Sequence, residues 1–191
     1  ATLEEFGVAS YVAPSACKEP GYQPDKMSFD VLFDEIEEAG TLFGAEDAAG
    51  ELVTAQRDQL SELVPSTAGL SALWYSSGTD TPYVGAGIGA PQMILETAGL
   101  SNIASDVQDT WSPLSWEAII DADPEVIVLV DASWNTAEQK KALLEQNPAT
   151  AELAAVKERR YLTVPFAAGE AGVRNVDAVR SILEQLDGLG L

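Results

Sequence analysis

The chain has 191 residues, 46% of them hydrophobic, which is enough to bury the core of one domain or slightly more. Its 31 acidic residues outnumber the 10 basic ones, so the net charge is −21. This charge argues against nucleic acid or an anionic membrane as a partner, and it is also typical of a soluble, self-repelling surface. The sequence contains no histidine, which excludes Ser-His-Asp and Cys-His catalysis and the usual zinc sites.

Cys17 is the single cysteine, so no disulfide can form within the chain. The tripeptide before it, Pro14-Ser15-Ala16, resembles that of a lipoprotein signal. The preceding residues 2–6 are acidic and amphipathic, however, whereas such a signal needs a basic start and an apolar run. Cys17 is therefore expected to be a small buried or loop residue. No stretch approaches the ~20 apolar residues of a membrane span.

The first elements in chain order are a helix end over Leu3–Phe6, closed by Gly7, and a strand over Val8–Val12. That strand needs a sheet to join. Residues 13–27 hold three prolines and a glycine and are predicted to be a linker.

A long helical region follows the linker. Ser28 can cap its first helix, whose apolar residues from 29 to 39 recur at spacings of three and four and form one face. Gly40 and Gly44 interrupt this helix, and a second helix over 46–63 is stopped by Pro65.

From residue 70 onward, strands and helices alternate. Strands are predicted over 70–75, near 103, over 126–130 and over 160–164; helices over 90–98, 115–121, 136–146 (capped by Thr136) and 175–187 (capped by Asn175). This alternation predicts an α/β fold with a mainly parallel sheet covered by helices. Ligands of such sheets bind outside the carboxyl ends of the strands, so the loops at those ends are the candidate site.

The run Gly85-Ala86-Gly87-Ile88-Gly89 is similar to a phosphate-binding loop in composition. It lacks the spacing of the dinucleotide motif and follows no strand directly, so a tight loop against Pro91 is the plainer interpretation. Its amides could still meet an anion at the start of the next helix. A nucleotide-dependent enzyme therefore stays as an alternative.

Hydroxyl and aromatic side chains gather after the first strand of this region, among them Ser77 and Tyr83. Without histidine, and without a Ser-x-x-Lys motif, hydrogen bonding to a solute suits these serines better than nucleophilic catalysis. Trp111 follows a polar run and Trp134 follows the strand over 126–130, so contact with a ligand and plain packing are both open. Trp116 belongs to an amphipathic turn and is predicted to be core.

Arg174 is one of few basic residues, and it lies between the last strand and the last helix. A guanidinium near aromatic faces suits an anionic or carbonyl-rich ligand. The alternative is an ion pair with Glu170 or Asp177.

These segments carry a resemblance. Their order along the chain resembles the iron-siderophore and cobalamin class of bacterial ABC-transporter substrate-binding proteins. The segments are FDVLFDEIEEAGTLFGAEDAAGELVTAQRDQL, then PQMILETAGLSNIASD with SWEAIIDADPEVIVL, and then NPATAELAAVKERRYLTVP with VRNVDAVRSILEQL. The resemblance implies residues 1–27 as a remnant of an N-terminal lobe with its linker, 28–64 as an inter-lobe helical connection, and 65–191 as the C-terminal ligand-binding lobe. The rest of the first lobe, with any signal peptide and lipid anchor, would then be absent from this chain.

The resemblance also implies a role for named residues. Ser77, Tyr83, Trp111, Trp134 and Arg174 would line the ligand cleft, while Glu96 would dock to basic residues of the membrane permease. It implies a monomeric, non-enzymatic receptor with no cofactor or directly bound metal, at the periplasmic or outer face of the cytoplasmic membrane. Its solute would be a ferric siderophore or a corrinoid. The segment WYSSGTDTPYVGAGIGAPQM also resembles actinobacterial proteins proposed to bind a deazaflavin coenzyme precursor. A structural or scaffold domain is a further alternative.

Overall fold

The computed structural model describes residues 3–19 and 21–191, with residue 4 described by its backbone alone. Its helices are α1 (Phe29–Phe43), α2 (Glu46–Ser61), α3 (Ala90–Thr97), α4 (Trp116–Ala122), α5 (Ala137–Gln146), α6 (Ala154–Lys157) and α7 (Asn175–Leu189). Its strands are β1 (Ser71–Ser77), β2 (Tyr83–Gly85), β3 (Ser101–Asn102), β4 (Trp111–Pro113), β5 (Val126–Asp131) and β6 (Tyr161–Pro165). Short 3₁₀ turns cover Leu3–Phe6, Pro14–Ala16, Thr150–Glu152 and Phe166–Ala168.

The strands form one sheet in the order β4-β2-β1-β5-β6, with β3 paired to the start of β1. The sheet is parallel through β1, β3, β5 and β6. On one side it is extended by β2, which pairs antiparallel with β1, and by β4, which pairs antiparallel with β2. This confirms the predicted α/β class. β2 and β4 were not predicted, because three-residue strands that contain Gly or Pro leave no alternating pattern.

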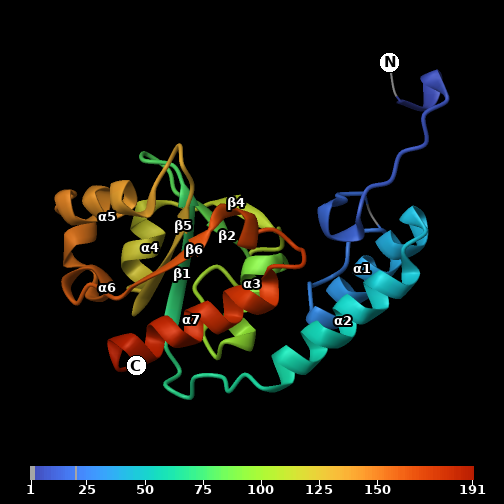
Figure 1. Ribbon diagram of the computed structural model, residues 1–191. Helices are drawn as coiled ribbons and strands as arrows, with labels where there is room; N and C mark the ends of the chain where they lie inside the picture. Colours follow the sequence, from blue (N-terminus) through green and yellow to red (C-terminus); the bar gives the residue numbers. More distant parts are fainter. Residues whose placement is uncertain (1–2, 20) are drawn as a thin grey trace.

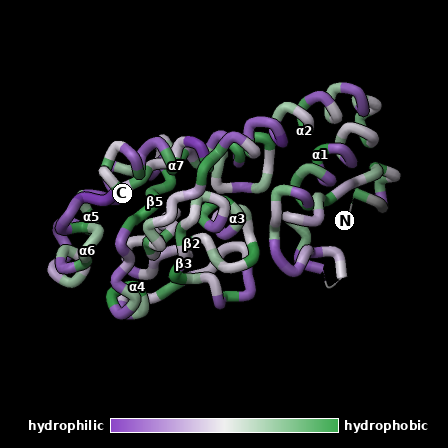
Figure 2. Tube along the Cα trace, turned by 90° about the horizontal axis from the view of Figure 1, so that it is seen from below, coloured by the Kyte–Doolittle hydropathy of each residue, from purple (hydrophilic) through white to green (hydrophobic). Residues whose placement is uncertain are grey.

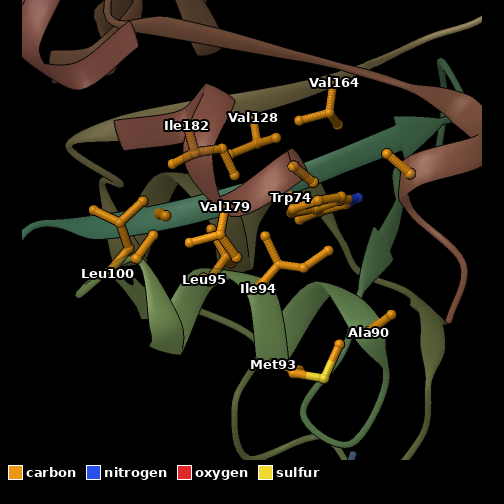
Figure 3. Close-up of a cluster of buried hydrophobic side chains, with 14 of the residues drawn as sticks. Trp74, Ala90, Met93, Ile94, Leu95, Leu100, Val128, Val164, Val179 and Ile182 are labelled. Atoms are coloured by element: carbon orange, nitrogen blue, oxygen red, sulfur yellow. The ribbon is translucent and has the colours of Figure 1, made fainter. Parts of the chain in front are cut away.

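Helices flank the sheet (Figure 1), and a hydrophobic cluster lies on each of its faces. Figure 3 shows the larger one, in which strand residues such as Trp74 and Val128 pack between α3 and α7. Leu73, Ile127 and Leu129 point to the other face, where Ile119 of α4 and residues of α5 and α6 cover them. Inward-facing residues of β1 and β5 are 0–1% exposed, as central parallel strands buried on both faces require.

α1 and α2 lie side by side at one flank of the sheet domain (Figure 1). Ser28 caps α1, as predicted, and Gly44 ends it in the left-handed conformation. Gly40 lets the helices approach closely: a Cβ there would lie 2.4 Å from the Cβ of Ala49. Along both helices and α7, hydrophobic and hydrophilic stretches alternate (Figure 2), which matches amphipathic helices with one buried face.

The predicted strand over Val8–Val12 is wrong. These residues form no strand and are exposed, and in the described part of the chain no neighbouring strand supplies a hydrogen-bond ladder. Polar contacts to α1 hold this region instead: the Tyr11 hydroxyl donates to Glu38 at 2.5 Å, and the Ser15 hydroxyl donates to Glu35 at 2.7 Å. Cys17 is a half-buried free thiol, in line with its predicted loop position.

Two side-chain contacts bear on how α2 and α7 hold the sheet domain. Gln56 of α2 donates to the Val173 carbonyl at 2.6 Å, in the loop before α7. Gln185 of α7 pairs with the backbone of Thr163 in β6, accepting from its N–H at 2.7 Å and donating to its carbonyl at 3.0 Å. Within the described residues, no helix combines the length and apolarity needed to cross a bilayer.

Candidate functional site

The carboxyl ends of β1, β5 and β6 meet at one edge of the sheet, where the loops after β1 and β5 rise together (Figure 1). Ser77 ends β1 there, half-buried, and is paired in register with Tyr83 at the start of β2. The edge therefore collects side chains from three separate loops and from β2. This is the position where α/β sheets bind ligands.

Tyr83 and Trp111 form a stacked pair, with ring centroids 6.2 Å apart and planes at 13°. Tyr83 pairs with Pro113 across β2 and β4, so Trp111 lies diagonally from it on the same face. Tyr83 is 42% exposed, whereas Trp111 is half-buried against the α3–α7 cluster. We call Tyr83 and Trp111 the sheet pair.

Trp134 and Phe166 form a second pair, edge to face, with centroids 5.2 Å apart and planes at 68°. Both come from loops: Trp134 follows β5, and Phe166 follows β6. Trp134 is 72% exposed and Phe166 is 44% exposed. We call them the loop pair. The sequence prediction missed Phe166. Like Trp134, it comes shortly after a strand, and this position could have indicated it as a candidate site residue.

The β6–α7 loop runs beside both pairs. Phe166 opens it, and a Cβ at Gly169 would lie 3.5 Å from the Trp111 ring. The buried side chain of Asn175 holds the loop: its amide donates to the carbonyls of Ala168 and Glu170 at 3.0 and 2.9 Å, and its oxygen accepts from Gly172 at 2.8 Å. The predicted role of Asn175 as helix cap is wrong, because it is the first residue of α7 and its side chain turns back into this loop.

Arg174 ends the same loop and is exposed. The alternative ion pairs are not formed within the described residues: Asp177 pairs with Arg180 at 3.0 Å instead, and Glu170 has no cationic partner there. The guanidinium is thus exposed at the end of the β6–α7 loop, next to the start of α7. In so acidic a chain, an exposed Arg is a distinctive local charge.

The glycine loop does not present its amides to a ligand. Ala86, Gly87 and Ile88 donate their N–H groups to the carbonyls of Thr110, Val107 and Asp109, at 2.9–3.2 Å. A Cβ at Gly87 would lie 2.0 Å from the Ser105 carbonyl oxygen, so glycine is required by close backbone packing. These three amides are therefore not free to bind an anion, and the structure gives no support to the nucleotide-dependent enzyme that the composition of the loop left open.

Glu96 lies away from this edge, on α3, and its carboxylate contacts the Lys26 ammonium at 2.5 Å. Both side chains are about half exposed.

Trp116 packs edge-on against Tyr75 and donates to the Thr79 carbonyl at 2.8 Å, so its predicted packing role fits. Of the residues predicted to line a cleft, the structure pairs Tyr83 with Trp111 and places Ser77 beside Tyr83; Trp134 and Arg174 lie at the ends of neighbouring loops.

A hollow of about 340 Å³ lies between the segment around residues 13–27 and the sheet domain. Trp111, Thr110 and Glu170 form its wall on the domain side, and Lys18 and Gln23 lie opposite. Lys18 also pairs with Asp109 at 3.0 Å, which lowers the pKa of that carboxyl. Across the part of the chain that the structure describes, no three Cys, Asp or Glu side chains gather in a way that could hold a metal ion.

Comparison with known proteins gives a family and a fold. The sequence profile of a family described as periplasmic binding protein matches residues 19–168. A periplasmic binding protein from Veillonella parvula is 25% identical with a TM-score of 0.78, and the match covers 93% of this chain and 61% of that one. A structure titled as an ABC-type Fe³⁺-hydroxamate transport system from Saccharomonospora viridis is 25% identical with a TM-score of 0.84, covering 96% and 63%.

A periplasmic heme-binding protein from Roseiflexus sp. RS-1 has the same fold, at 23% identity and a TM-score of 0.68, covering 87% of this chain and 66% of that one. In each of these comparisons the chain spans less than two thirds of the related chain. Among curated proteins, none matches. The resemblance seen in the sequence is confirmed, and the family consists of binding proteins of transporters rather than enzymes.

Proposed function

The chain belongs to the periplasmic binding protein family, and from this premise we propose that it holds a chelated-iron or cofactor-like solute for an ABC importer. The observation that carries the proposal is the edge formed by the carboxyl ends of β1, β5 and β6. Exposed aromatic rings gather there, and the exposed Arg174 ends the same β6–α7 loop that Phe166 opens.

The sheet pair and the loop pair supply flat apolar faces. Contiguous exposed aromatic patches, unlike single exposed rings, often mark a contact with a ligand or partner. Because they are joined by hydroxyls at Ser77 and Tyr83, the edge suits a solute with a large apolar body and a few polar groups. Ser77, Tyr83, Trp111, Trp134 and Arg174 are the proposed contacts, and Phe166 joins them.

The solute class follows from charge and from the donors present. A bare transition metal finds no histidine here, so iron would arrive inside a chelate and cobalt inside a corrinoid. The hydroxamate and heme named for the related structures fit this pattern, and a deazaflavin precursor belongs to the same class of large, conjugated solutes. Arg174 favours a solute with an anionic or carbonyl arm.

Delivery would take place at a membrane permease, through Glu96. Its carboxylate is half-exposed on α3 and contacts Lys26, an ion pair that an incoming basic side chain can replace at little cost because exposed pairs are weak. The protein would work at the periplasmic or outer face of the membrane, anchored by lipid in its precursor form, as a monomer. The second wall of the cleft would come from an N-terminal lobe beyond this chain.

Tryptophan fluorescence can test the proposal on this chain. We would titrate it with a ferric hydroxamate, hemin, cobalamin and a deazaflavin, using Arg174→Ala and Trp134→Phe as variants and Arg180→Ala as the matched control. We expect one solute to quench, a loss of about tenfold or more in affinity for Arg174→Ala, and no change for Arg180→Ala. Equal affinities in the unsubstituted chain and all three variants, or quenching by none of the solutes, would count against the proposed site.

A further inference from the structure

Lys140 is a cation in the interior. It lies in α5 and is 2% exposed, although lysine is rarely buried without a partner of opposite charge. Its ammonium group instead donates to two backbone carbonyls, that of Val130 at 2.6 Å and that of Asn135 at 2.7 Å. Burial lowers the pKa of Lys140, and the nearby Asp131 carboxylate opposes this shift.

Those two carbonyls bracket the turn that carries Trp134. Val130 lies near the end of β5, and Asn135 directly follows the tryptophan. Ala132 and Asn135 bond to each other across the turn, at 3.0 and 3.3 Å. The Asp131 carboxylate accepts from the Ala137 amide at 2.8 Å, which ties the start of the turn to the start of α5.

The sheet explains why Val130 needs a donor from outside. The register between β1 and β5 ends at Tyr75 and Leu129, because β1 is irregular between Tyr75 and Ser77 and turns toward β2. Val130 thus lies one residue beyond the last β1 partner. A groove of about 430 Å³ separates the loop after β1 from α5 at this point, and Lys140 lies in its wall.

An apolar side chain would fill the same space under α5 without bringing a charge inside. It would leave the Val130 carbonyl without this donor and the Asn135 carbonyl with the Ala132 amide alone, and a buried carbonyl without a partner is destabilising. The buried ammonium group of Lys140 is therefore best explained by its hydrogen bonds to the turn after β5, rather than by the packing of α5. Thr136 and Gln139 add a capping box at the same place, so the turn is held from both ends.

We propose that Lys140 is a positioning residue of the binding edge: its ammonium group fixes the turn after β5 and so places Trp134 against Phe166. The placement of the loop pair follows from contacts within the chain. Its importance for solute binding rests on the function proposed above.

The test labels the four tryptophans with 5-fluorotryptophan and follows their ¹⁹F resonances, assigning that of Trp134 from Trp134→Phe. In Lys140→Met we expect the Trp134 resonance to move toward that of free fluorotryptophan. We also expect the amides of Asn135 and Ala137 to exchange about tenfold faster, while the resonance of Trp74 stays in place. Lys140→Arg keeps donors and should restore part of the shift. The matched control is Lys141→Met, whose exposed partner is Glu138.

The proposal is overturned if Lys140→Met leaves the Trp134 resonance and these exchange rates unchanged, or if Lys141→Met changes them equally. Should Lys140→Met fail to fold, the unsubstituted chain still decides the question. A slowly exchanging lysine ammonium signal should then show contacts to the Asn135 region in ¹⁵N-resolved NMR, and a freely exchanging one overturns the proposal. Since none of these readouts needs a solute, they are separate from failure of the proposed function.

Discussion

The two aromatic pairs of the binding edge are held in different ways. The sheet pair lies on neighbouring strands, where register fixes Trp111 diagonally from Tyr83 and the α3–α7 cluster buries its inner side. The loop pair lies on two turns outside the sheet, with Trp134 far more exposed than any other tryptophan of the described chain. Side-chain contacts to the backbone, from Lys140 and Asn175, hold these turns.

Because of this difference, the stability of the fold and the placement of the exposed rings depend on different parts of the edge. Removing the Trp111 ring disturbs the core, whereas removing a ring from the exposed loop pair leaves the core intact. The loop pair is therefore the part of the edge that can change with the solute at little cost to folding. Four predictions can break or sharpen this comparison.

The largest effect is expected at the glycine loop that supports β4. Gly87→Ala puts a methyl group 2.0 Å from the Ser105 carbonyl oxygen, which the backbone must move to relieve. We expect a loss of about 3 kcal/mol in the free energy of unfolding, measured by urea denaturation. Gly50→Ala, where a Cβ meets nothing within 4 Å, should instead be neutral or stabilise its helix by up to about 1 kcal/mol. Similar results for the two variants would contradict the close packing of this loop.

The two tryptophans should differ next. Trp111→Ala removes a half-buried ring from the core and should lower the free energy of unfolding by about 2 kcal/mol. Trp134→Ala removes an exposed ring, and about 0.5 kcal/mol is expected. Urea denaturation of both variants measures the difference. Equal losses would mean that the loop pair is part of the core after all.

Thr136→Ala tests how the turn after β5 is supported. It removes the cap that accepts from the Gln139 amide at 3.2 Å, and about 1 kcal/mol should be lost. Ser115→Ala removes an equivalent cap from α4, where Ser115 accepts from Ala118 at 3.1 Å, and should cost a similar amount. Acrylamide quenching of Trp134 should increase in the first variant alone. If Ser115→Ala increases it equally, the cap acts through global stability.

The smallest effect concerns pH. Burial raises the pKa of Tyr75 to about 12, while an unfolded tyrosine ionises near pH 10. The folded state thus keeps its proton longer, so this stability is complete below pH 10 and is lost as the pH rises toward 12. Compared with Tyr75→Phe, the unsubstituted chain should lose about 1 kcal/mol more between pH 10 and 11. Urea denaturation at both pH values checks this, with the exposed Tyr22→Phe as a control; an unchanged difference would contradict it.

The sequence predicted the central elements well because each carries a strong local signal. Ser28 and Thr136 cap helices where expected, and the apolar run from Val126 is the central strand β5. The strand over Val8–Val12 was wrong, because alternation shows that a segment could pair but says nothing of a partner. Residues far apart in the sequence decide such pairing.

The candidate site was predicted in kind but not in arrangement. Trp134, expected after the strand over 126–130, does follow β5 at the carboxyl edge of the sheet, and its contact with a solute stays a prediction. The contact between Trp134 and Phe166 depends on the conformations of two loops, and the sequence of either loop alone does not predict it. The preferred interpretation of the glycine loop, a tight loop against Pro91, is confirmed: a Cβ at Gly85 would lie 2.3 Å from the Pro91 side chain, and the amides of residues 86–88 bond to residues 107–110.

The side-chain amide of Gln185 has a consequence for how molecules of this protein meet one another. It occupies the outward N–H and carbonyl of Thr163 on the last strand, β6, much as the backbone of another strand would. At the opposite end of the sheet, β4 finishes in Pro113, which has no N–H to offer. A strand arriving from a second molecule therefore finds few free partners at either border. At high local concentration, this sheet should resist the edge-to-edge growth that leads to aggregates.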